Sequence, residues 1–321
     1  MSTESEQDLV VFEMMRKFLF ILSLFLVLGC QSQDEIETSI VGLDISPTSD
    51  TVAYAVLTKS GVSIYIGKLN ESNASLILVG SKETSYLSPT FSPDGARLAV
   101  IRGKTDDLHE QTILIVDLIG NPLDSIVVSG GIITEAKYSN DGEEILFCRA
   151  REFAHYSPIV PSAPHGVDIY SLNLRERTVS KLTDLDGYVV KDLEVIGNDT
   201  ILFNMKGDSS GLYLLKRSAK VLMGIPPVNN PRGDLGYYYS PIYCSITNTL
   251  IFAAPYQIYS MSLEKRFANL IYDGRGKSHI YWIKVAIRDC RVYFTHSAMD
   301  LLVYSVAIDG SDLRSYPIKI D

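Results

Sequence analysis

Two short strand patterns recur six times along this chain of 321 residues, always in the same order. The first is an apolar triplet whose final residues are separated by 46, 47, 56, 49 and 42 positions. These final residues are Tyr54, Val100, Phe147, Phe203, Phe252 and Phe294. The second pattern ends at Tyr65, Leu114, Tyr170, Tyr213, Tyr259 and Tyr304. A repeat of this length predicts one small structural unit per copy, packed side by side.

The clearest copy spans residues 86–100 and reads YLSPTFSPDGARLAV, which predicts a strand, a tight turn and a second strand. Pro93 presets φ, Asp94 can accept a hydrogen bond from the backbone two residues on, and Gly95 tolerates a positive φ. Residues 138–142 are a weaker copy of this turn, residues 45–47 keep only its first part, and the last three repeats lack it.

Each repeat also contains a strand before and a strand after these two patterns, at about residues 87–91 and 125–128 in the second repeat. Four short strands in each unit, six times over, predict an all-β fold: a six-bladed β-propeller of four-stranded antiparallel blades over residues 40–321. Alternation such as KDLEV at 191–195 is typical of strands with one buried face. A β-sandwich is the alternative architecture, but it does not predict six equal units.

The segment SPTFSPDGARLAV resembles the WD40-like repeat of TolB-type propellers, and the resemblance extends over roughly residues 40–320. It implies a six-bladed propeller. Proteins with this repeat serve as binding scaffolds, as protease gates and, less often, as enzymes, so the resemblance indicates the fold and leaves the function open.

The composition is that of a globular protein, with 46% hydrophobic and 21% charged residues. The net charge is −9, and no basic run exceeds two residues, so we expect no nucleic-acid partner. Four cysteines are too few for a disulfide scaffold, and we interpret Cys148 and Cys244 as small buried apolar residues. No Cys/His spacing suggests a metal site, and we expect neither a metal nor a cofactor.

The N-terminal 30 residues predict an export signal. A basic start at Met14-Met15-Arg16-Lys17 precedes an apolar segment, residues 18–28, which is too short to span a bilayer as a helix. Residues 1–13 are acidic and unlike the start of a signal, which suggests that translation begins at Met14 or Met15.

The stretch Val27-Leu28-Gly29-Cys30 resembles the lipobox of bacterial lipoproteins, in which the cysteine becomes the lipidated first residue. The resemblance implies a membrane anchor at Cys30, and Gln31 is similar to the residue found in lipoproteins sorted to the outer membrane. Residues 31–39 would then be a tether, and the propeller would face the periplasm. An ordinary signal peptide or an uncleaved anchor is the alternative.

Loop lengths indicate where such a propeller would bind. The distances between the ends of the two patterns are 11, 14, 23, 10, 7 and 10 residues, so the third blade carries an insertion at about 149–167. Another long connection, residues 224–237, is expected on the same face. Long loops on a rigid scaffold are frequent binding sites, although both insertions also fit a tolerated surface elaboration. The candidate ligand-binding residues are Arg149, Arg151, His155, Tyr156, His165, Asn230, Arg232, Asp234, Tyr237 and Tyr238.

Two alternatives accompany that set. Packing between blades would explain Tyr238 equally well, and the repeated tyrosine of the second pattern is interpreted as packing. The sequence contains no GxSxG, P-loop or GxGxxG motif, which favours a monomeric, non-catalytic scaffold for an envelope protein, a peptide or a glycan. The alternative function is a lyase or hydrolase of sugars or peptides, with its site at the channel mouth, so enzymatic activity stays an open question.

Overall fold

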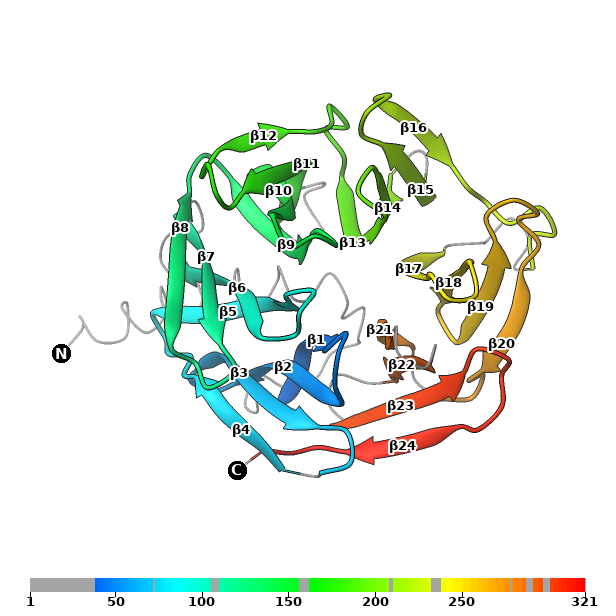
Figure 1. The fold of residues 1–321 in the computed structure, drawn as a ribbon, viewed down its shortest axis with the longest axis horizontal. Coiled ribbons are helices and arrows are strands. Elements are labelled where there is room, and N and C mark those ends of the chain that lie inside the picture. Colours follow the sequence, from blue (N-terminus) through cyan, green and yellow to red (C-terminus); the bar gives the residue numbers. More distant parts are fainter. Residues whose placement is uncertain are drawn as a thin grey trace.

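The computed structural model describes residues 38–71, 73–104, 110–155, 162–207, 210–231, 238–277, 279–286, 291–296 and 301–320. The export signal, Cys30 and most of the tether lie outside these residues. Six small antiparallel sheets stand around a central axis and form a ring (Figure 1). The chain is therefore a six-bladed β-propeller, as the repeats predict. No helix among the described residues has the length and apolar character needed to cross a membrane.

Blades are numbered in chain order, and each blade uses its strands in sequence from the axis outward. Blades one to three consist of β1 (Ser39–Ile45), β2 (Thr51–Thr58), β3 (Gly61–Lys68), β4 (Asn73–Leu78), β5 (Thr84–Phe91), β6 (Arg97–Lys104), β7 (Gln111–Asp117), β8 (Pro122–Val128), β9 (Ile132–Tyr138), β10 (Glu144–His155), β11 (Ser162–Asn173) and β12 (Val179–Lys181). Blades four to six consist of β13 (Val189–Ile196), β14 (Thr200–Lys206), β15 (Gly211–Lys216), β16 (Val221–Gly224), β17 (Tyr239–Cys244), β18 (Thr249–Ala254), β19 (Gln257–Ser262), β20 (Asn269–Asp273), β21 (Tyr281–Ala286), β22 (Arg291–Thr295), β23 (Leu302–Ala307) and β24 (Arg314–Pro317).

The two repeated patterns meet across the second and third strands of every blade. The final residue of the first pattern lies directly opposite the final residue of the second: Tyr54–Tyr65, Val100–Leu114, Phe147–Tyr170, Phe203–Tyr213, Phe252–Tyr259 and Phe294–Tyr304. In blades three to six the two rings stack, with centroids 5.5 to 5.8 Å apart. Direct cross-strand aromatic pairs stabilise a sheet, so the packing interpretation of the repeated tyrosine is confirmed.

The turn after β5 has the hydrogen bonds that its residues predict. The Asp94 carboxylate accepts hydrogen bonds from the Ser92 hydroxyl and from the Ala96 amide at 3.0 Å, and Gly95 has a φ of 69°. The hydrogen bond from Ser92, followed by that from the Ala96 amide, lowers the pKa of Asp94. In blade three, Ser139 and Asp141 form the same arrangement.

Replacing Asp94 with alanine is expected to lower the free energy of unfolding by about 1 kcal/mol, because two hydrogen bonds to an exposed carboxylate are lost. Since the folded-state pKa is lowered, this contribution is present at neutral pH and disappears as the pH falls below the usual range of an aspartate. Urea titrations of both proteins at neutral and strongly acidic pH measure it. If the two proteins differed as much in unfolding free energy at acidic pH as at neutral pH, the proposed role of the Asp94 carboxylate would be contradicted.

The ring closes at the outer edge of blade one. After β24 the chain continues into β25 (Lys319–Ile320), which pairs in parallel with β4, Lys319 opposite Asn73 and Ile320 opposite Ala74. Ile318 is buried beside the core shared by blades one and six. The last strand therefore joins the sixth blade to the first.

The innermost strands are joined by hydrogen bonds from one blade to the next. Each of these strands contains a β-bulge, and in β5, β13 and β17 a non-glycine residue at the bulge has positive φ: Ser88, Asp192 and Ser240. A side-chain oxygen of one blade accepts a backbone amide of the next. The contacts are Asp44 with Phe91 at 2.8 Å, Ser88 with Ala136 at 3.1 Å, Glu135 with Leu193 at 2.9 Å, and Asp192 with Ser240 at 2.9 Å.

Two cysteines lie in the described blades. Cys148 is free and buried, as expected, and burial raises the pKa of its thiol. Cys244 is also buried, but it is disulfide-bonded, to a partner outside the described residues. The interpretation of Cys244 as a simple apolar residue is therefore wrong, because a pairing that depends on the fold cannot be read from cysteine positions alone.

Candidate functional site

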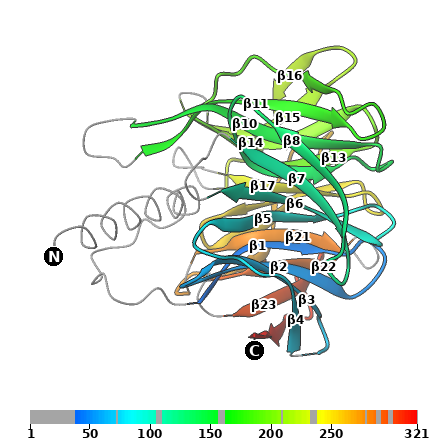
Figure 2. The ribbon, with the colours of Figure 1, turned by 90° about the vertical axis from the view of Figure 1, so that its left-hand side faces the viewer.

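The insertion of blade three is a β-hairpin and not a loop. Strands β10 and β11 stay paired as far as His155 and Ser162, and together they extend beyond the ring on one side (Figure 2). The neighbouring strands do not follow them: β9 pairs with β10 only as far as Ala150. The outer part of the hairpin therefore has edges that no described strand pairs.

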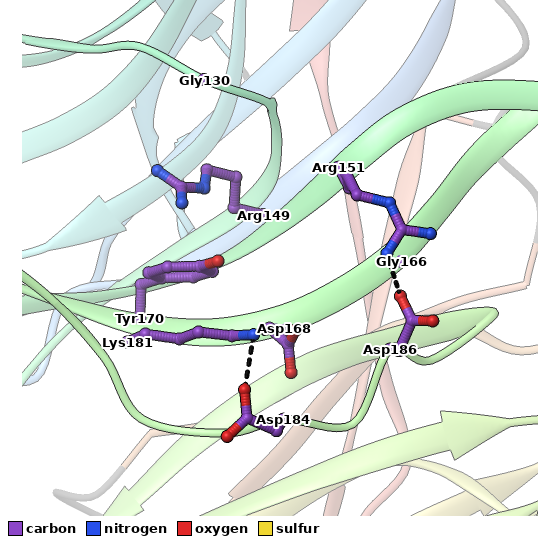
Figure 3. A pocket seen from close by; sticks show the side chains of 9 residues that line it. All are labelled: Gly130, Arg149, Arg151, Gly166, Asp168, Tyr170, Lys181, Asp184 and Asp186. Atoms are coloured by element: carbon purple, nitrogen blue, oxygen red, sulfur yellow. Dashed lines mark hydrogen bonds and ion pairs between the residues drawn. The ribbon is translucent and has the colours of Figure 1, made fainter.

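A polar pocket of about 230 Å³ lies at the base of this hairpin. It is lined by Gly130, Arg149, Arg151, Gly166, Asp168, Tyr170, Lys181, Asp184 and Asp186 (Figure 3). These residues come from the turn before β9, from β10, β11 and β12, and from the connection that leads to blade four.

Arg149 lies over the Tyr170 ring at one wall of the pocket (Figure 3). Its guanidinium carbon is 3.9 Å from the centre of the Tyr170 ring, and its Nη1 donates a hydrogen bond to the Ser129 carbonyl at 3.2 Å. Tyr170 in turn stacks on Phe147. The aromatic pair Phe147–Tyr170 thus packs against one side of the Arg149 guanidinium.

The other two cations of the pocket are paired with carboxylates. Arg151 contacts Asp186 at 2.8 Å, and the Lys181 ammonium contacts Asp184 at 2.7 Å and Asp168 at 3.0 Å (Figure 3). The hydrogen bonds that the Lys181 ammonium donates to Asp184 and Asp168 raise its pKa. Asp168 is buried, and it also accepts hydrogen bonds from the Thr183 hydroxyl and the Leu185 amide.

Glycine is required at two places in this wall. A Cβ atom on Gly131 would lie 2.9 Å from Arg149 Cγ and 2.3 Å from the Ala150 carbonyl oxygen. Gly166 has a φ of 63°, and a Cβ there would lie 2.8 Å from the Asp186 carboxylate. Arg149 and Arg151 therefore pack against backbone that carries no side chain, at Gly131 and Gly166.

Comparison with known proteins identifies the architecture. Residues 32–154, which include blades one and two and part of blade three, match the model of the TolB beta propeller domain. This part of the chain is thus similar to the TolB beta propeller domain. No curated protein sequence matches the chain significantly.

Solved structures agree with the TolB-type fold. TolB from Acinetobacter baumannii aligns with a TM-score of 0.62 at 14% identity, over 88% of this chain but 64% of that one, less than two thirds of its length. A putative TolB from Agrobacterium tumefaciens gives 0.58 at 16% identity, over 79% and 87% of the two chains. An oligogalacturonate lyase in complex with manganese gives 0.57 at 12% identity, over 86% and 76%. Identities this low show a shared fold alone.

The propeller brings together only some of the predicted ligand-binding residues. Arg149 and Arg151 both line the pocket. The half-buried His165 directly precedes the lining residue Gly166 in β11, and its ring centroid is 5.0 Å from that of Tyr188. His155 ends β10, but its side chain is not described. Tyr156, Arg232, Asp234 and Tyr237 lie outside the described residues.

The second predicted loop packs against blade five. Asn229 exchanges two hydrogen bonds with the backbone of Ala268, both at 2.9 Å. The Tyr238 hydroxyl donates to the exposed Asn230, but the Tyr238 ring is buried edge-on against Phe252 and Tyr259. The expectation that the Tyr238 ring contributes to an exposed surface is therefore wrong, and the packing alternative is correct.

Sequence reasoning missed the other charged residues of the pocket, which belong to no motif. Asp168 lies opposite Arg149 across β10 and β11, the pairing of β12 with β11 brings Lys181 into the pocket, and Asp184 and Asp186 follow β12. Asp168, which directly precedes Ile169 and Tyr170 of the blade-three repeat, is the sequence feature that could have indicated a charged site here.

A second polar cluster lies between blades five and six. The Lys277 ammonium donates to the Tyr272 hydroxyl at 3.2 Å, and that hydroxyl is 2.7 Å from Nε2 of the buried His296. Nearby, His279 and Tyr256 form a similar pair at 2.9 Å. In the part of the chain that the structure describes, no three His, Cys, Asp or Glu residues are grouped as a metal site.

Proposed function

We propose that this protein is an exported, non-catalytic binding scaffold of the bacterial cell envelope, which holds a protein, peptide or glycan at the blade-three hairpin. The observation that carries the proposal is the hairpin itself, which projects from a rigid ring and has a charged pocket at its base. Binding by a preorganised surface costs little ordering of the scaffold, which favours affinity without covalent chemistry.

The proposed location rests on the N-terminal sequence and on one feature of the fold. The signal-like residues 14–28 and the lipobox-like end at Cys30 would place the propeller on the periplasmic side, anchored in the outer membrane. The disulfide at Cys244 is consistent with an oxidising compartment, because such bonds are rare in the cytosol. Both features support export of a monomeric propeller.

Shortening the hairpin tests the binding proposal. Because Ala150 pairs with Val167 and Glu152 with His165, an Asn-Gly turn in place of residues 152–165 would join Arg151 to Gly166 across a tight two-residue hairpin. We expect affinity purification from detergent-solubilised envelopes to recover a partner with the intact protein and to lose at least nine tenths of it with the short hairpin.

A matched control changes the other side of the same blade. Arg175 and Glu176 are exposed in the turn between β11 and β12, and replacing both with alanine is expected to leave partner recovery unchanged. Identical recovery by the intact and shortened proteins would contradict the proposed role of the hairpin.

The second candidate function is a propeller enzyme, and the Lys277–Tyr272–His296 chain is the observation that favours it. A tyrosine hydroxyl held between an ammonium and an imidazole can transfer a proton. The structural likeness to an oligogalacturonate lyase suggests the substrate to test. Release of unsaturated product from oligogalacturonate with manganese, abolished in Tyr272→Phe, would support the enzyme over the scaffold.

A further inference from the structure

We infer that the pocket at the base of the hairpin binds the side-chain carboxylate of an acidic residue in an extended peptide segment, with Arg149 as the anchor. This inference deepens the proposed function, because it rests on the blade-three hairpin being the recognition surface. Four features of the pocket support it: the lack of a carboxylate contact at Arg149 among the described residues, the position of Arg149 over Tyr170, the open strand edge beside it, and the acidic rim.

Arg149 is the one cation lining the pocket that contacts no carboxylate among the described residues. Arg151 is paired with Asp186 and Glu152, and Lys181 with Asp168 and Asp184. Only a backbone carbonyl and an aromatic face neutralise the Arg149 guanidinium in part. A half-buried cation in this position favours an anionic partner.

The orientation of Arg149 selects the kind of anion. A guanidinium has five N–H donors in a planar fork, and one of its nitrogens already donates to Ser129. The contact with the Tyr170 ring and the hydrogen bond to Ser129 restrict the guanidinium, so less freedom is lost when a ligand binds. The remaining donors match the two oxygens of a carboxylate, the geometry in which arginine binds most strongly.

The strand edge beside the pocket suggests that the carboxylate belongs to a peptide. β10 continues for five residues beyond Ala150, where its pairing with β9 ends. An extended peptide can add to such an edge by backbone hydrogen bonds and place alternate side chains in pockets. Next to that edge, Gly130 has open space where a side chain would stand, so a backbone can approach closely.

The acidic rim argues against a polyanion. Asp184 and Asp186 line the same pocket as Arg149, Glu152 contacts the neighbouring Arg151, all three are exposed, and the whole protein has a net charge of −9. A polyuronate or a nucleic acid would bring further negative charges against these carboxylates, which disfavours binding. A single glutamate flanked by neutral or basic residues avoids this repulsion.

Fluorescence anisotropy with the full chain in detergent tests the inference. The probe is a fluorescein-labelled peptide with one central glutamate between threonine and lysine residues, and the comparison peptide has glutamine in its place. We expect the glutamine peptide to bind at least tenfold more weakly, and Arg149→Gln to weaken binding of the glutamate peptide to the same extent.

Two further variants distinguish the effect of the planar Arg149 guanidinium from the effect of positive charge alone. Arg149→Lys keeps the charge without the planar fork and is expected to recover only part of the affinity. Arg175→Gln removes an exposed cation in the turn between β11 and β12, away from the pocket, and is expected to change the affinity less than twofold. Thermal unfolding of each variant followed by circular dichroism shows whether the propeller is intact.

Several outcomes would overturn the inference: equal binding of both peptides, no effect of Arg149→Gln, no binding of the glutamate peptide, or tighter binding of trigalacturonate than of the peptide. The outcome is separable from that of the scaffold proposal. Arg149-dependent peptide binding without a hairpin-dependent partner in envelopes would support the pocket and contradict the scaffold. A hairpin-dependent partner without glutamate binding would do the reverse.

Discussion

Replacing Phe252 with alanine is expected to lower the free energy of unfolding by about 3–5 kcal/mol, the usual cost of removing a fully buried aromatic ring. Phe252 is completely buried, stacks on Tyr259 with centroids 5.7 Å apart, and meets Tyr238 edge-on at 5.1 Å. The loss combines the transfer of the ring to water with a cavity between blades four and five. Chemical denaturation followed by fluorescence measures it.

Phe267 provides the matched control in the same blade. Its side chain is 53% exposed, so Phe267→Ala is expected to change the stability by less than about 0.5 kcal/mol. Equal effects of the two substitutions would contradict the assignment of the repeated aromatic pair to the core.

Replacing Glu135 with alanine is expected to lower the free energy of unfolding by about 2–5 kcal/mol, because two backbone amides between blades lose their acceptor. The Glu135 carboxylate accepts hydrogen bonds from the amides of Asp192 and Leu193, which lie in the bulge of β13. Asp192 has a positive φ, a conformation that is unfavourable for this residue without such support. Removal of the carboxylate therefore also destabilises the bulge.

Glu135→Gln keeps one acceptor oxygen and is expected to lose about half as much stability. Glu143→Ala, at an exposed position of the same blade, is expected to be near neutral. Equilibrium unfolding in urea measures all three variants. Faster amide exchange at Asp192 and Leu193 in Glu135→Ala would locate the effect, and an unchanged stability would refute the inter-blade role.

The charges near Glu135 show how closely these inner strands are coupled. Lys137 of β9 lies 3.2 Å from Glu194 of β13. Burial alone would lower the pKa of Lys137, but the carboxylates of Glu194, Asp44 and Glu135 together outweigh burial and raise it. For Lys191, burial dominates and lowers the pKa. Carboxylates from blades one, three and four therefore act together on Lys137.

The fold could be predicted because its determinants are local and repeated. A tight turn such as Pro93-Asp94-Gly95 and an apolar pair at a fixed place in each hairpin, aromatic in five of the six, predict one blade, and six copies predict the ring. The bulges of the inner strands could not be predicted, because Ser88 and Asp192 adopt positive φ only when the next blade supplies or accepts a hydrogen bond.

The candidate site was predicted only in part. The length of the insertion located it in blade three, but the sequence indicated a loop and not the hairpin, in which Pro164 of β11 lies opposite Phe153. Pro164 is tolerated because β11 is an edge strand at that point, where a missing N–H disrupts no ladder. Arg149 and Arg151 were found from the sequence, whereas Asp168 and Lys181 meet them only through strand pairing.

The most direct test of the central claim is site-specific photocrosslinking in living cells of the natural host. A photoreactive phenylalanine analogue at Glu152, beside the pocket, is expected to form a covalent adduct with a partner. The same analogue at Glu176, exposed at the opposite turn of blade three, is expected to form none. Adducts at Glu176 but not at Glu152, or equal adducts at both positions, would contradict recognition at the hairpin.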